Sequence, residues 1–183
     1  MTTRRQQRRR RGGGILGRGT EGCVVDSLRC EPSGYVAKVF FTDRPHTNPD
    51  VQSRLAEIDP EEARFAQYHS ASCEDVESNR DVLACGQGKP VRHVVLMKRL
   101  NPFSEKLTRA QFRYLRESLE ILHRNGILHG DLPGNVMVDP MDGMPRIIDW
   151  GNSSIVPSSD PFLRHEMTHL VSGQFYKGVS DKD

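Results

Sequence analysis

The stretch LHRNGILHGDLPGNVMV, residues 122–138, decides the fold class of this chain. A helix predicted over 108–125 leads into it, and Asn125-Gly126 supplies the helix stop. The apolar side chains of this helix recur at three- and four-residue steps at Phe112, Leu115, Leu119 and Leu122. The His-x-Asp that follows places the carboxylate of Asp131 where it can accept a proton from a hydroxyl group. The amide oxygen of Asn135 is of the type that coordinates Mg²⁺.

A second acid lies downstream, in the segment IIDWG of residues 147–151. An apolar strand ends at Asp149, and the tryptophan and glycine behind it permit a turn. A carboxylate in this place suits the Mg²⁺ ion that bridges nucleotide phosphates. The turn-rich MDGMP between the two acids predicts a hairpin of strands 136–138 and 146–149.

Two further signals lie upstream of these acids. The segment GRGTEGCV, residues 17–24, has the pattern GxGxxGxV between two strand-like runs. Glycines allow a hairpin to lie close over phosphates and to present its backbone N–H groups to them. Lys38 follows in the strand-like segment YVAKVFF, residues 35–41, where its ammonium group requires an anion.

In this order and spacing, residues 15–151 resemble a protein-kinase-like domain, with HGD in place of HRD and DWG in place of DFG. Short strings, among them Tyr35-Val36-Ala37-Lys38 and Ile58-Asp59-Pro60, are similar to serine/threonine kinases of large nucleocytoplasmic DNA viruses. Small secreted bacterial effector kinases are the competing relatives. The resemblance implies an α+β protein-kinase-like two-lobe fold with a truncated, minimal C-lobe.

The resemblance also assigns roles to residues. Asp131 would be the catalytic base, Asn135 and Asp149 the Mg²⁺ ligands, and Lys38 the phosphate anchor. Glu57 is the first choice of partner for Lys38, with Glu61 and Glu62 as alternatives. The ATP-binding set would comprise Gly17, Gly19, Gly22, Val24, Ala37, Lys38, Glu57, Met97, Leu100, Asn135 and Asp149, in which 97–100 is the hinge beside the adenine.

Three departures from the kinase pattern accompany the resemblance. Asn135 follows Asp131 by four residues instead of five, and Pro133-Gly134 replace the lysine between them. Gly130 replaces the arginine that would pair with a phosphorylated activation loop, which predicts activity without such phosphorylation.

The predicted organisation is an Arg-rich disordered tail over 1–14, an N-lobe over 15–98 with the glycine loop, the strand lysine and helix C, and a C-lobe over 99–183. We expect strands at 82–85 and 91–97. Further helices are expected from about Val51, from Glu61 to Ser70 and from Asp160 to Ser172.

The formal net charge of +2 conceals an asymmetry, because six arginines lie in the first eleven residues. Without them the chain has 20 cationic against 24 anionic side chains, or about −4. Nucleic acid is therefore a candidate partner only for the tail, whereas a protein is the expected substrate. The sequence does not indicate an oligomeric state.

Composition also bears on location. No apolar run approaches the roughly 18 residues of a membrane span, and the N-terminus lacks a signal peptide's apolar region. The four cysteines have no CxxC spacing, so we expect reduced thiols in an intracellular protein, in the cytoplasm or nucleus of a host cell or associated with a virion if it is viral.

The leading prediction is an ATP- and Mg²⁺-dependent serine/threonine protein kinase. A small-molecule kinase and a nucleotide- or partner-binding pseudokinase are the alternatives within the fold. A remote alternative is a zinc hydrolase, because residues 165–169 read HExxH, with His165 and His169 on one helix face and Glu166 as the base. The fourteen residues that follow the motif contain no His or Glu for a third ligand, only Asp181 and Asp183.

Overall fold

A computed structural model describes residues 14–43, 48–102 and 106–172. These residues form two compact units. The first unit contains residues 14–43 and 69–97, and the second contains the remaining described residues.

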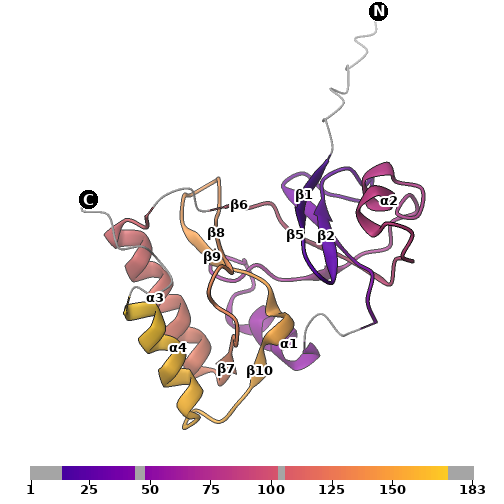
Figure 1. Cartoon of the computed structure of the whole chain (residues 1–183). Helices are drawn as coiled ribbons and strands as arrows, with labels where there is room; N and C mark the ends of the chain where they lie inside the picture. Colours follow the sequence, from indigo (N-terminus) through magenta and orange to yellow (C-terminus); the bar gives the residue numbers. More distant parts are fainter. Residues whose placement is uncertain (1–13, 44–47, 103–105, 173–183) are drawn as a thin grey trace, which may run out of the picture. The chain divides into compact units, whose positions relative to one another are not determined.

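The first unit is built on a five-stranded sheet (Figure 1). Its strand order is β1 (Ile15–Arg18), β2 (Gly22–Val25), β3 (Tyr35–Phe40), β5 (His93–Lys98) and β4 (His69–Ser70). Strands β1, β2 and β3 form an antiparallel meander in which Val24 lies opposite Lys38. The short helix α2 (Arg80–Gly86) packs against β2, and Val25, Ala37 and Val39 are buried in the core between them.

All four cysteines are paired within this unit, so the expectation of reduced thiols is wrong. Cys23 of β2 is bonded to Cys85 of α2, and Cys30 is bonded to Cys73. The partners are 62 and 43 residues apart in the sequence, which is why short-range Cys spacing did not reveal them. Disulfides are rare in the reducing cytosol, so the thiol argument for an intracellular location no longer holds.

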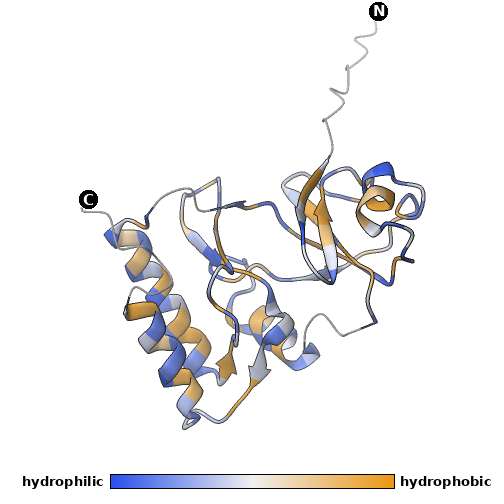
Figure 2. Cartoon of the chain, viewed as in Figure 1, coloured by the Kyte–Doolittle hydropathy of each residue, from blue (hydrophilic) through white to orange (hydrophobic). Residues whose placement is uncertain are grey.

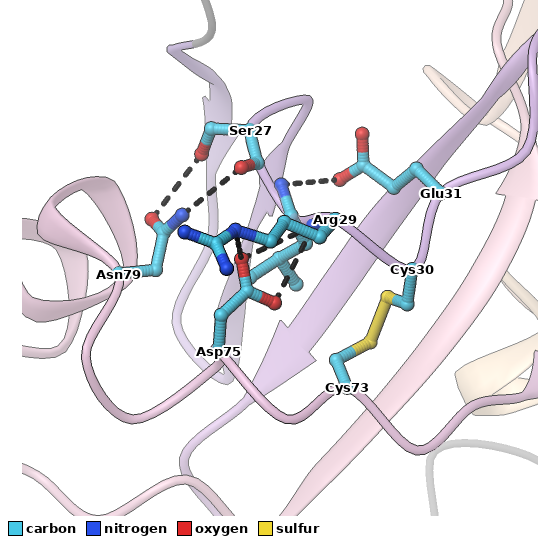
Figure 3. The surroundings of a disulfide bond; sticks show 8 residues. Ser27, Arg29, Cys30, Glu31, Cys73, Asp75 and Asn79 are labelled. Atoms are coloured by element: carbon cyan, nitrogen blue, oxygen red, sulfur yellow. Dashed lines mark hydrogen bonds and ion pairs between the residues drawn. A yellow bond between two sulfur atoms is a disulfide. The ribbon is translucent and has the colours of Figure 1, made fainter.

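Hydrogen bonds surround the Cys30–Cys73 disulfide (Figure 3). The Asp75 carboxylate accepts the backbone N–H of Arg29 at 3.1 Å, and the amide of Asn79 donates to the carbonyl of Ser27 at 3.1 Å. These bonds join the loop after β2 to the segment before α2. The disulfide therefore lies in an ordered connection between the sheet and the helix.

Two expected elements differ in the structure. Residues 82–85 belong to helix α2 and not to a strand, because Asn79 caps the helix by accepting the N–H groups of Asp81 and Val82. Residues 61–68 contain no helix. The carboxylate of Asp59 instead accepts the backbone N–H groups of Ala63, Arg64 and Phe65 at 2.7–2.9 Å, which fixes a loop.

The second unit contains the long helices and two small sheets. Its helices are α1 (Pro49–Ile58), α3 (Arg109–Arg124) and α4 (Pro161–Val171), and a 3-10 turn, η1, covers Trp150–Asn152. One sheet has the order β6 (Asn101–Pro102), β8 (Val136–Val138), β9 (Pro145–Ile147), and the other pairs β7 (Ile127–Leu128) with β10 (Ser154–Ile155). The predicted hairpin and the helices at 108–125 and 160–172 are thereby confirmed.

Helix α3 begins with a capping box, in which Thr108 accepts the N–H of Gln111 and the Gln111 side chain accepts the N–H of Thr108. Figure 2 shows α3 and α4 as amphipathic helices that lie side by side. Three leucines of α3 and Leu170 of α4 join one core with Trp150. No described helix is both long and apolar enough to cross a membrane.

Helix α1 belongs to this second unit. Its buried residues Val51 and Leu55 join the same core as Leu119 of α3. The described residues 48–68 therefore group with the second unit, whereas the predicted division placed everything from 15 to 98 in one lobe. The physical reason is that the apolar face of α1 is buried in the core of the second unit, to which α3 also contributes.

The Cys30–Cys73 disulfide closes a loop of 43 residues, so removing it frees the unfolded chain. We expect the double variant Cys30→Ser/Cys73→Ser to lower the free energy of unfolding by about 3–4 kcal/mol in chemical denaturation. Digestion of alkylated, non-reduced protein should also release peptides linked through these two cysteines. Recovery of all four cysteines in alkylated form would contradict the pairing.

Candidate active site

The loop between β7 and β8 carries Asp131, and its entry is shaped by two glycines. Gly126 ends α3 with φ +66°, and Gly130 has φ +80°. A Cβ atom on Gly130 would lie 2.6 Å from the carbonyl oxygen of Asn152. A side chain at position 130 would therefore strain the backbone and clash with η1, and glycine avoids both.

The ring of His129 joins the two segments that carry the candidate acids. Its Nε2 lies 2.8 Å from the carbonyl oxygen of Ile148, to which it donates, and its Nδ1 accepts the N–H of Asp131 at 3.3 Å. Burial lowers the pKa of this fully buried imidazole below its ordinary value, although the hydrogen bond to Ile148 and the nearby carboxylates oppose the shift. The ring of His129 thus connects the backbone of the Ile148 segment to that of the Asp131 loop.

Asp131 itself remains exposed, and its side chain accepts one hydrogen bond, from the Asn152 amide to Oδ2 at 3.4 Å. Its backbone carbonyl accepts the amide N–H of Asn135 at 2.6 Å. This bond uses the amide nitrogen of Asn135, so the oxygen is the atom that the side chain can offer to a cation. The four-residue spacing thus keeps Asn135 beside Asp131.

Asp149 has a left-handed backbone, with φ 64° and ψ 76°, which is uncommon for a residue other than glycine. The carbonyl of Asn135 accepts the N–H of the preceding residue, Ile148, at 3.0 Å. The hydroxyl of Tyr68 donates to Oδ1 of Asp149 at 3.3 Å. The segment before Asp149 is therefore tied to Asn135 as well as to His129.

The aromatic residue after Asp149 anchors this segment in the core. Trp150 is fully buried, donates from Nε1 to the carbonyl of Ala66 at 2.7 Å, and packs edge-on against Phe65. Its ring also lies 5.0 Å from that of His129, centroid to centroid. The backbone of the Asp149 turn is consequently fixed by packing on both sides.

Glu166 of α4 is a site residue that the sequence did not identify as such. It is 9% exposed, and its carboxylate accepts the N–H of Gly130 at 2.9 Å and contacts His123 Nε2 at 2.8 Å. A longer bond of 3.4 Å comes from the N–H of His129. Burial alone would raise the pKa of Glu166, but the hydrogen bonds from His123 and Gly130 outweigh it and hold the pKa below its usual range.

These contacts also decide how the HExxH segment is interpreted. Glu166 is buried against the Asp131 loop, so its carboxylate is not placed to activate a metal-bound water. The rings of His165 and His169 lie against each other, 4.0 Å between centroids. Among the described residues no group of three or more His, Cys, Asp or Glu side chains could hold a metal ion, which disfavours the zinc hydrolase.

The first unit carries the glycine loop and Lys38. A Cβ on Gly22 would clash with the carbonyl of Val39, so packing of β2 on β3 requires this glycine. A Cβ on Gly17 would meet no protein atom within 4 Å, and Gly19 donates its N–H to the carbonyl of Gly22 at 2.9 Å. Glycine at position 17 is therefore not required by packing within the protein, which leaves space for a ligand to approach the backbone.

The remaining predicted nucleotide residues are distributed over both units. Lys38 is half-buried on β3 beside the buried Ala37, with its ammonium 5.2 Å from the centroid of the Phe40 ring. Val24 lies opposite Lys38 on β2, and Met97 is buried at the end of β5. Leu100 is buried in the second unit, where the three glutamates considered for Lys38 also lie.

Those glutamates have different surroundings. Glu57 is exposed near the end of α1, and Glu61 is exposed in the loop that follows. Glu62 is buried, has φ 53°, and accepts the N–H of Gln67 at 3.2 Å. The ammonium of Lys98 donates to the backbone carbonyls of Glu61 and Glu62. The pairing of Lys38 with one of these carboxylates stays a prediction.

Asp149 and Asn135 fit the requirements of Mg²⁺ as far as their chemistry goes. They offer one carboxylate and one amide oxygen, and their backbones are joined through the Ile148–Asn135 hydrogen bond. Mg²⁺ typically takes one or two such protein ligands and fills the remaining positions with water and phosphate oxygens. The second unit thus combines two oxygen donors of the type that Mg²⁺ takes with an exposed carboxylate, that of Asp131.

A two-unit α+β chain with these elements is characteristic of one enzyme class, the protein kinases. The sequence matches the protein kinase domain family over residues 11–178, so the chain belongs to that family. The Arabidopsis thaliana protein named MAP3K epsilon protein kinase 1 is 22% identical over 165 residues. This match covers 88% of the chain but only 12% of the plant protein's length. The predicted α+β protein-kinase-like fold is confirmed.

Three site residues escaped the sequence analysis. Tyr68, Asn152 and Glu166 contact the Asp149 and Asp131 segments from positions 21 to 81 residues away in the sequence. Only Glu166 carried a signal, the HExxH pattern, and that pattern suggested a different chemistry. Asn152 follows the motif of residues 147–151 without belonging to it, and Tyr68 lies in a segment for which no motif was identified.

The low pKa of buried His129 makes stability depend on pH. Because the folded protein binds this proton less readily than the unfolded chain, whose value is near 6.5, stability is lost as the pH falls below 6.5. We expect a slope of up to about 1.4 kcal/mol per pH unit there, removed in His129→Gln. Trp150 fluorescence reports the unfolding, and the exposed His165→Gln is the control. An equal slope in His129→Gln would contradict the assignment.

Proposed function

We propose that this chain is a Mg²⁺-dependent serine/threonine protein kinase that transfers the γ-phosphoryl group of ATP to a hydroxyl group of a protein. The observation that carries the proposal is the geometry around Asp131. An exposed carboxylate stands on a loop whose backbone is held by His129 and by buried Glu166. Family membership supplies the reaction class.

In this mechanism Asp131 accepts the proton of the acceptor hydroxyl and orients its oxygen toward the phosphoryl group. Its exposure leaves it accessible to an acceptor, and the Asn152 amide restricts the orientation of its side chain. Asp149 and Asn135 are the residues that would hold Mg²⁺. The bound ion supplies neutralisation of the phosphate charge.

Lys38 and the glycine loop contribute to nucleotide binding in this proposal. The ammonium of Lys38 supplies a positive charge for a phosphate group, and the open space beside Gly17 admits the nucleotide to the backbone. Met97 and Leu100 are proposed to lie beside the adenine. Glu57, Glu61 and Glu62 remain the candidates for a carboxylate that orients Lys38.

The proposed enzyme needs no phosphorylation of an activation loop. Position 130 lacks the arginine that would bind such a phosphate, and a side chain there would clash with the carbonyl of Asn152 in η1. The Asp131 loop is instead held by Glu166, an unmodified carboxylate of the chain itself. The loop is therefore positioned without modification of the protein.

A protein acceptor is preferred over a small molecule because the matched family and the plant relative are both protein kinases by name. A pseudokinase is the second candidate, because the lysine between Asp131 and Asn135 is missing. The basic tail, a candidate for binding nucleic acid or acidic substrates, lies outside the described residues.

Substitution of the two acids separates these possibilities. We expect Asp131→Asn and Asp149→Ala each to lower phosphate transfer from radiolabelled ATP to generic protein substrates by about a hundredfold or more. The half-buried acid Glu117, whose ion pair with Arg64 near the surface contributes little, provides the control Glu117→Gln.

Nucleotide binding is measured in the same variants by the shift of the thermal unfolding midpoint. Asp131→Asn should keep the stabilisation by ATP and Mg²⁺, because Asp131 contacts the acceptor and not the nucleotide. Stabilisation of the wild type by ATP without any transfer would identify a pseudokinase. Transfer at wild-type rate in Asp131→Asn would refute the assigned base.

A further inference from the structure

A cavity of about 390 Å³ lies beside Asp131, between its loop and helix α4. Asp131, Leu132 and Pro133 line it from the loop, and Phe162, His165 and His169 line it from the helix. All of these residues belong to the second unit. A molecule whose hydroxyl group reaches Asp131 therefore has this cavity directly beside its reacting atom.

Helix α4 turns a row of three rings toward the cavity. Phe162, His165 and His169 are spaced at three and four residues, so they share one side of the helix. Folding buries Leu163 and Leu170 of the same helix but leaves Phe162 63% exposed. A large ring left exposed at the rim of a cavity is suited to binding an apolar group.

The charges around the cavity point to the same kind of occupant. Among the described residues no lysine or arginine lines it, whereas the carboxylate of Asp131 does. An acidic side chain would be repelled there. The second carboxylate in the lining, that of Glu166, is compensated by donors from Gly130 and His123, and it therefore offers little attraction to a basic side chain. The exposed surface of the lining is mostly apolar.

We propose that this cavity is the acceptor-side subsite of the enzyme and that it receives a bulky apolar or aromatic side chain next to the phosphorylated serine or threonine of a peptide segment. Phe162 is its specificity-determining residue. The inference rests on the proposed function, because it takes the position of the acceptor hydroxyl from Asp131. It adds the substrate class that the family assignment leaves open.

Phosphorylation of a positional peptide library by the full chain with ATP and Mg²⁺ tests this. One residue flanking the acceptor should be preferred as Phe, Leu or Met, with kcat/KM about tenfold above Gly, Asp or Lys at that position. In Phe162→Ala the ratio between the Phe and Gly peptides should fall to about one. Val171→Ala, which removes an apolar side chain 56% exposed on the same helix but outside the cavity, should keep the wild-type ratio.

A variant that gains a new substrate preference distinguishes a change of specificity from a general loss of activity. Phe162→Lys places an ammonium group at the rim, so acidic peptides should become substrates preferred over the Phe peptide. Three outcomes would overturn this inference and leave the kinase assignment intact. They are peptide phosphorylation without a flanking preference, a preference for Lys or Arg, and an unchanged preference in Phe162→Ala. Absence of transfer to any peptide or protein, or transfer to small alcohols alone, would overturn both.

Discussion

The rest of the site depends on the hydrogen bonds that the buried carboxylate of Glu166 makes. It accepts the N–H of Gly130 at 2.9 Å and meets His123 of α3 at 2.8 Å, so it joins helix α4, helix α3 and the Asp131 loop. The hydrogen bond from Gly130 is part-buried and has a charged acceptor, and such a bond contributes roughly 1.5–3 kcal/mol. The position of Asp131 is therefore determined by a residue 35 positions further along the chain.

His129 provides the second constraint and connects the two candidate acids. Its ring spans from the carbonyl before Asp149 to the N–H of Asp131, and burial favours the neutral form that can do both. Catalysis of phosphoryl transfer depends mainly on positioning and on charge neutralisation. A loop fixed by one carboxylate and one imidazole meets the first requirement without an arginine or a phosphorylated segment.

The sequence revealed the parts of the site that depend on local patterns, and it missed those that depend on long-range contacts. Asp131, Asn135 and Asp149 could be found because their motifs follow a strong amphipathic helix and a hairpin. Glu166 was misinterpreted because its partners, 36 and 43 residues away, are invisible in a one-dimensional pattern. The two disulfides were not predicted for the same reason: their cysteines are far apart in the sequence. Helix α2 was missed because its apolar residues resemble a short strand, although Asn79 carries a capping signal.

Hydrogen exchange of the Gly130 amide tests most directly whether Glu166 holds the Asp131 loop. The reference is the amide of Gly134 in the same loop, for which no acceptor is found among the described residues. The account predicts exchange at Gly130 about tenfold or more slower than at Gly134, and loss of that difference in Glu166→Ala while the amides of α3 stay protected. Equal exchange at Gly130 and Gly134 in the wild-type protein would contradict it.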